Sequence, residues 1–230
     1  VRRRLRFFNV GTMDAWQARY GKICNSTLFR NSPIFNSDDG AVLMWLRDGE
    51  LSSDLISTKP WHADNLQDRL DSIRKLSKLK DPKVFLPKLK ALCAEAGVAV
   101  VAKKAPPKCR SSGASRMVAP DKAMVLLSFR GLSDDKFWFT VFHELGHLIL
   151  HGDKTFVDSD MNADDLDDYE RDANEFSSRM IVPEESIKEF YNLQADKTKI
   201  IRFSAKVGVS SGLIVGQMQH QKMIRPDQMN

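Results

Sequence analysis

Hydrophobic residues in the first part of the chain recur mostly at the spacing of amphipathic helices. Leucine or isoleucine returns every three or four positions between residues 66 and 79, which predicts a helix there. Pro82 interrupts this pattern, and a second helix is expected over residues 84–96. Gly97 is its natural end, because glycine readily adopts the left-handed conformation that closes helices. Residues 1–80 are therefore predicted to form a mostly helical N-terminal region.

The hydrophobic period then changes from that of helices to that of strands. Residues 98–102 form a short apolar run, and residues 117–118 and 124–129 are expected to pair as a hairpin around a turn at residues 120–121. Short strands next to helices are typical of α+β folds. We therefore predict that residues 81–230 form one α+β domain, in which a small antiparallel sheet packs against helices.

The most hydrophobic helix of the chain is predicted to follow this hairpin. Ser133 or Asp134 is a suitable N-cap for a helix over residues 135–151, and apolar residues on all sides of that helix indicate that it is buried. Residues 153–168 are expected to be a solvated loop, since their many aspartates lack the spacing of a calcium-binding loop. Later helices are expected near residues 169–180, near residues 184–191 and, as two short helices, in the last part of the chain.

Two histidines and a glutamate lie inside this buried helix. His143 and His147 are four residues apart, so both rings point to one side of the helix and can bind one tetrahedral Zn²⁺. Glu144 follows the first histidine, where it can take a proton from water at the metal, which makes it the predicted catalytic base. Gly146 lets another segment approach the helix closely. The structural alternative is a pair of core histidines bonded to backbone carbonyls. We favour the zinc site, because uncompensated burial of such groups costs on the order of several kcal/mol.

A catalytic zinc site takes a third ligand from the protein. Asp153 is one alternative, and a later helix offers Glu170 and Glu175. The buried stripe of that helix is predicted to contain Tyr169, Ala173, Phe176 and Met180. Glu170 lies beside this stripe and Glu175 lies on the solvent side, so Glu170 is the predicted ligand. Asn174, four residues after Glu170, is placed to hydrogen-bond the ligands.

Two further features near the helix are open to more than one interpretation. His151 continues the four-residue series, so it is expected either to support the ligands or to stabilise the reaction oxyanion. A histidine favoured by the helix dipole at the C-terminal end is the structural alternative. The predicted strand over residues 125–128 is expected to pair with an extended substrate by strand addition.

Composition and charge set limits on the class of protein. Of the 230 residues, 42% are hydrophobic and 28% are charged, which is typical of a soluble globular protein. The formal net charge of +5 is too small to indicate nucleic-acid binding by itself. Part of it comes from Arg2, Arg3, Arg4 and Arg6, which are expected to belong to a solvated linker. No stretch has the roughly eighteen apolar residues of a membrane span, so no membrane partner is expected.

The cysteines indicate the compartment. Cys24, Cys93 and Cys109 lie far apart in the sequence and form no closely spaced pair. A small, odd number of cysteines is typical of proteins whose thiols stay reduced. The N-terminal arginines are not followed by the apolar stretch of a signal peptide. We therefore expect a cytoplasmic protein.

Several segments resemble a known family. Residues 139–151 resemble the active helix of the ImmA/IrrE-type metallopeptidases, and residues 170–176 with 180–183 resemble that family's second motif, whose Glu is the third zinc ligand. The match places that ligand at Glu170, in agreement with the helical-face argument. Weaker resemblance covers Phe7-Phe8, residues 45–50 and residues 209–217.

The resemblance is closest to a subgroup in which this peptidase region follows a helix-turn-helix DNA-binding domain, as in HigA-like antitoxins. Residues 1–95 show no convincing helix-turn-helix, so residues 1–80 are expected to include a linker from a missing domain, and DNA would be a partner only through that domain. The implied fold is gluzincin-like.

The implied function is that of a zinc-dependent endopeptidase that cleaves a partner regulatory protein. That partner would be a repressor-like transcriptional regulator or a toxin encoded nearby. The alternative is an antitoxin-like binding module that holds a toxin or senses a signal with little proteolysis. A third, less favoured class is a zinc amidase acting on non-peptide bonds. The intact pair of histidines with Glu144 favours the endopeptidase, because a pure scaffold has no need of a base.

Overall fold

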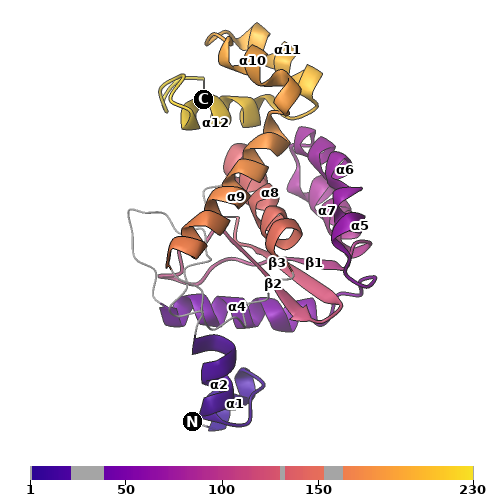
Figure 1. Ribbon diagram of the computed structural model, residues 1–230, viewed down its shortest axis with the longest axis vertical. Coiled ribbons are helices and arrows are strands. Elements are labelled where there is room, and N and C mark those ends of the chain that lie inside the picture. Colours follow the sequence, from indigo (N-terminus) through magenta and orange to yellow (C-terminus); the bar gives the residue numbers. More distant parts are fainter. Residues whose placement is uncertain (1, 22–38, 130–132, 153–162, 230) are drawn as a thin grey trace.

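The computed structural model describes residues 2–21, 39–129, 133–152 and 163–229. The fold is α+β, as predicted: helices surround one small sheet, and the two ends of the chain lie at opposite ends of the molecule (Figure 1). Among the described residues, no helix combines the length and the apolar character that crossing a membrane requires.

The sheet has three strands in the order β1-β3-β2, with β1 at Val98–Ala102, β2 at Gly113–Ala119 and β3 at Lys122–Leu127. β2 and β3 form the predicted antiparallel hairpin. β1, however, pairs parallel with β3, so the sheet is mixed, and the expectation of a wholly antiparallel sheet is wrong at β1. The reason is the connection over residues 103–112, which leaves a gap one strand wide between β1 and β2. Strand β3 occupies this gap and runs parallel to β1.

Alternate residues of the strands face two different layers, as the period of a strand requires. One face contributes to the main core, through Val98, Val100, Ala123, Val125 and Leu127. The opposite face contributes to a second, smaller core, through Val101, Ala114, Met124 and Leu126. Helix α8 (Asp134–His151) lies over the first face, and helix α4 (Asp39–Ser53) lies across the second (Figure 1).

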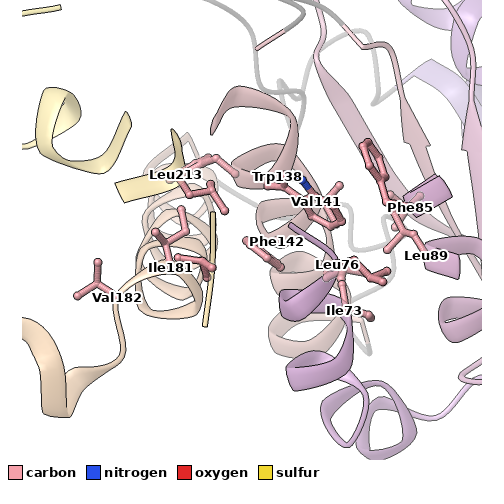
Figure 2. Packing of buried hydrophobic residues seen from close by; sticks show 14 of the residues in the cluster. Ile73, Leu76, Phe85, Leu89, Trp138, Val141, Phe142, Ile181, Val182 and Leu213 are labelled. Atoms are coloured by element: carbon pink, nitrogen blue, oxygen red, sulfur yellow. The ribbon is translucent and has the colours of Figure 1, made fainter. Parts of the chain in front are cut away.

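Helix α8 is the centre of the main core. Ser133 is its N-cap residue, one of the two that were expected, and the helix is buried on nearly all sides up to Leu148. Its Trp138, Val141 and Phe142 lie between two groups of apolar residues (Figure 2). One group comes from α6 (Leu70–Lys75), η2 (Leu76–Lys78) and α7 (Pro82–Ala94). The other comes from α9 (Ala163–Ile181), from Val182 directly after it, and from α12 (Ser211–His220).

The N-terminal part is helical but more divided than expected. Its first elements are α1 (Arg2–Phe7), α2 (Met13–Trp16) and the π-helix η1 (Gln17–Gly21). The single helix expected over residues 66–79 is split into α5 (Ala63–Gln67), α6 and η2. Leu66, Ile73 and Leu76 of these elements belong to the main core, so packing crosses the domain boundary expected at residue 80.

Helix α7 begins at Pro82 rather than after it. Proline is tolerated in the first turn of a helix, because its missing N–H would have no partner there. Asp81 is the N-cap, and its carboxylate accepts a hydrogen bond of 2.9 Å from the Lys83 N–H. Gly97 follows the helix with a positive φ of 86°, which fits the expected helix end.

The C-terminal third contains α9, η3 (Glu184–Ser186), α10 (Ile187–Tyr191), α11 (Lys197–Val207) and α12. The two short helices expected at the end of the chain are thus present. Helix α9 begins at Ala163, so the expected loop over residues 153–168 is wrong in its second half. Acidic residues are favourable in the first turns of a helix, where they face its positive dipole end. Residues 153–162 of that loop lie outside the described residues.

Candidate metal centre

His143, His147 and Glu170 meet where α8 and α9 pack against each other. The Nε2 atoms of the two histidines lie 3.1 Å apart, and they lie 3.4 Å and 3.1 Å from the Glu170 carboxylate oxygens. One ligand atom from each residue can be chosen so that all three lie within 4.8 Å of one another. The two rings stand nearly perpendicular, at 85°. Two imidazoles and a carboxylate form a set that can hold a metal ion.

Two close contacts set the position of α9 on α8. Gly146 faces Phe176, and a Cβ on residue 146 would lie 2.9 Å from the Cδ1 atom of that ring. Seven residues before Gly146, the Phe139 carbonyl accepts a hydrogen bond of 3.0 Å from the Ser177 hydroxyl. The helices run in opposite directions, so Glu170, farther back along α9, comes level with His147. The absence of a side chain at Gly146 therefore lets the ligands converge.

The charges within this group favour a bound cation. Burial alone would raise the pKa of Glu170, but His143 and His147 lower it to about 2. Burial would lower the pKa of His147, and the carboxylates of Glu170 and Glu144 raise it instead. The two carboxylates thus create a negative potential that favours a proton or a metal ion.

Glu144 is buried beside this group. It is 1% exposed, and neither carboxylate oxygen has a hydrogen-bond partner among the described residues. Burial raises its pKa, an effect that His143, His147 and the hydroxyl of Ser115 partly oppose. Buried polar groups in proteins normally have partners, so such a carboxylate indicates a site that acts on something outside the chain.

No sequence pattern indicated that strand β2 contacts Glu144. Its first residue, Gly113, lies so close to α8 that a Cβ there would be 2.5 Å from Oε1 of Glu144 and 2.6 Å from Cγ2 of Thr140. Glycine is therefore required at this position. No local pattern marks it, because the contact exists only once the hairpin is packed on the helix.

The other predicted site residues lie at different distances from the group. His151 is adjacent to it: its ring centroid is 5.9 Å from that of His147, and its Nε2 atom is 4.0 Å from Oδ2 of Asp172. Its role as a supporting or oxyanion-binding residue stays a prediction. Glu175 is exposed and accepts a hydrogen bond of 2.6 Å from Arg179, as expected for the solvent side. Asp153 lies outside the described residues.

Asn174 is not brought to the group. It is exposed, and within the described part of the chain it makes no hydrogen bond to a predicted ligand. The reason is the orientation of α9. Among residues 168–177, whose burial the structure describes, the fully buried positions are Ala173 and Ser177 rather than the broader stripe that was predicted. Glu170 lies on that narrower line, at the i, i+3, i+7 spacing, and Asn174 lies outside it.

The expected substrate strand also differs. Residues 125–128 begin inside β3, which is the central strand and already pairs with β1 and β2. A central strand has no free edge, so strand addition there is wrong. Among the described residues, β2 pairs on one side only, and it is the strand that contacts Glu144.

Comparison with known proteins bears on these residues directly. The model of the Peptidase M78 family, described as the IrrE N-terminal-like domain, matches residues 93–216, which include all of α8 and α9. No curated protein matches the chain. Because the match covers more than half of the 230 residues, the chain belongs to the Peptidase M78 (IrrE N-terminal-like) family of metal-dependent peptidases, the family that its active-helix and Glu170 segments resemble.

Proposed function

We propose that this protein is a zinc-dependent endopeptidase that cleaves a partner regulatory protein. The observation that carries the proposal is Glu144, a buried carboxylate without a hydrogen-bond partner among the described residues, directly beside the group formed by His143, His147 and Glu170. A structural core has no use for an unpaired buried acid, because its burial is costly. A hydrolase has such a use, because the acid is free to move protons.

The residues divide the work between binding and proton transfer. His143, His147 and Glu170 would hold Zn²⁺, which when bound supplies a Lewis acid that polarises a peptide carbonyl and acidifies water. Glu144 takes a proton from the attacking water and returns it to the leaving amine. The raised pKa of Glu144 brings it closer to the range in which a carboxyl group both accepts and releases protons.

The outer edge of strand β2 is evidence that the substrate is an extended peptide. This edge pairs with no other strand in the described part of the chain, and Gly113 brings the first residue of the strand into contact with Glu144. A peptide that adds to this edge would therefore run past the base. Main-chain pairing of this kind binds a polypeptide in extended form and leaves specificity to the side chains on either face.

The regulatory nature of the substrate is supported by the family resemblance. A repressor-like regulator or a toxin encoded nearby is the proposed partner, and contact with DNA would need a further N-terminal domain. The cytoplasm is the proposed compartment, because Cys93 and Cys109 are buried and form no disulfide within the described part of the chain, as expected for a reducing environment.

The test compares wild type with Glu144→Gln and uses Glu175→Gln, an exposed glutamate on α9, as the matched control. Each protein is mixed with the neighbouring regulator, with and without a chelator, and fragments are followed by mass spectrometry. Glu144→Gln should keep its zinc and its binding to the partner but lose cleavage by about 10² to 10⁴, the range for a lost general base. If Glu144→Gln controls the partner as well as wild type does, the antitoxin-like binding module is the better account.

A further inference from the structure

Residues 45–50 share the family resemblance, but they take no part in the metal centre. Residues 45–50 of α4 lie on the face of the sheet opposite α8 (Figure 1). The Trp45 Nε1–H donates a hydrogen bond of 3.0 Å to the carbonyl of Lys103, just after β1. Gly49 packs so tightly on β3 that a Cβ there would lie 2.6 Å from Leu126 Cδ2. Two residues of this segment therefore fix α4 against two of the three strands.

The third strand is contacted by a largely buried group of charged and polar side chains. This group, the Glu50 cluster, consists of Tyr20, Arg47, Glu50 and Arg116. Arg116 of β2 donates a hydrogen bond of 2.9 Å to Oε1 of Glu50. Arg47 and the Tyr20 hydroxyl donate to Oε2, at 2.7 Å and 2.9 Å. Glu50 is 2% exposed. A buried carboxylate is stable only with such compensation, so its partners are held firmly in place.

The N-terminal segment, residues 2–21, takes part in this cluster. Tyr20 belongs to η1, and its side chain is fully buried. The carbonyl of Phe7, at the end of α1, accepts a hydrogen bond of 2.7 Å from Nε of Arg47. Two groups from residues 2–21 therefore complete the hydrogen bonding of Glu50 and Arg47. If this segment moved away, both residues would lose a partner.

Strand β2 needs support from this side because it pairs with one strand only. Its residues alternate between the two layers. Gly113 contacts Glu144 on the α8 side, whereas Arg116 contacts Glu50 on the α4 side. The position of β2 relative to Glu144 is thus restrained from both faces. Gly113 itself makes only a close approach to α8, whereas Arg116 is held to Glu50 by a charged hydrogen bond.

We propose that Glu50 is a positioning residue, which holds strand β2 in place for substrate pairing and makes that position depend on the N-terminal segment. The inference rests on the proposed function only in taking β2 as the substrate edge. It assigns to residues 45–50 the role of joining the N-terminal segment to the substrate strand. An element upstream that pulls on residues 2–21 would then alter substrate binding without contacting the metal centre.

The test uses two variants of the full chain and one matched control. Glu50→Gln weakens the ion pairs and keeps the shape of the side chain, and Tyr20→Phe removes one hydrogen bond while keeping the ring. Glu95→Gln breaks the exposed pair between Glu95 and Arg69, 3.0 Å long, and serves as the control. Amide hydrogen exchange is measured separately for β2 and β1, together with zinc content and with KM and kcat for the regulator.

Glu50→Gln should speed exchange in β2 about tenfold, as expected for one lost charged hydrogen bond, while β1 changes much less. KM should rise by a similar factor, with kcat and zinc content unchanged, and Tyr20→Phe should show the same pattern more weakly. Equal changes in β1 and β2 would mean a purely structural role and overturn the proposal. An unchanged β2 in Tyr20→Phe would overturn the link to the N-terminal segment. If wild type cleaves nothing, the proposed function fails, and the exchange data still decide whether Glu50 holds β2.

Discussion

The buried polar groups on the two faces of the sheet differ in how completely they are hydrogen-bonded. On the α8 face, Nδ1 of His143 and both oxygens of Glu144 have no hydrogen-bond partner among the described residues. On the α4 face, both oxygens of Glu50 are bonded, and within the Glu50 cluster only Nε of Arg116 lacks a partner among those residues. Both sets are buried, so burial does not distinguish them. The difference is that one face leaves polar atoms available for a ligand, whereas the other uses them to hold the protein together.

The Glu50 cluster provides the largest expected effect. Glu50→Ala should lower the free energy of unfolding by about 3–5 kcal/mol, because it leaves Arg47 and Arg116 buried without a counter-charge. Urea denaturation followed by circular dichroism measures this change. The triple variant Glu50→Leu, Arg47→Met and Arg116→Met should recover much of the loss, since well-packed apolar residues often replace a buried ionic group at little cost. A loss below about 1 kcal/mol in Glu50→Ala would show that the cluster is solvated and that the two faces do not differ in this way.

Measurements of metal binding test whether the polar groups on the α8 face hold a ligand. Glu170→Gln should weaken Zn²⁺ binding by about 100-fold. Changes to residues that only support a ligand weaken binding by up to about this factor, and loss of a ligand should cost at least as much. Glu175→Gln should leave binding unchanged, because its side chain is exposed and bonded to Arg179. Competition with a chromogenic chelator gives both affinities. If Glu175→Gln or Asp153→Asn is the sensitive variant, Glu170 is not the ligand.

The contact between β2 and α8 predicts a smaller effect on activity. Gly113→Ala would place a methyl group against Glu144 and Thr140, so the base must shift. We expect kcat/KM to fall about 10- to 100-fold with the metal retained, as misplacement of a catalytic group by about 1 Å can cost about 10². Gly11→Ala is the control, since nothing lies within 4 Å of a Cβ there. Full activity in Gly113→Ala would mean that Glu144 has room to move or is not the base.

The smallest effect concerns Tyr20. Burial, the charge of Glu50 and its hydrogen bond raise the pKa of Tyr20 from 10.0 to about 12. A folded-state pKa above the unfolded one means that this stabilisation is complete below pH 10 and is lost as the pH rises through about 12. Tyr20→Phe should remove this alkaline dependence and cost about 1 kcal/mol at neutral pH. Tyrosinate absorbance against pH is the measurement, and an unchanged titration in Tyr20→Phe would contradict the shift.

The sequence alone determined those features of the protein that depend on local geometry. His143 and His147 share a side of α8 because four residues make about one helical turn, and the helix is buried because apolar residues surround it. Glu170 could be chosen over Glu175 because the two occupy different faces of one helix. The β2–β3 hairpin followed from turn residues between apolar runs.

Only the tertiary structure decided the contacts between distant segments. Glu50 and Arg116 are 66 positions apart, and nothing near either residue indicates the other. The parallel pairing of β1, the contact of Gly113 with Glu144 and the exposure of Asn174 likewise depend on how whole layers pack. The physical reason is that helical faces and turns are set by neighbouring residues, whereas the pairing of layers is set by the sum of many weak contacts across the molecule.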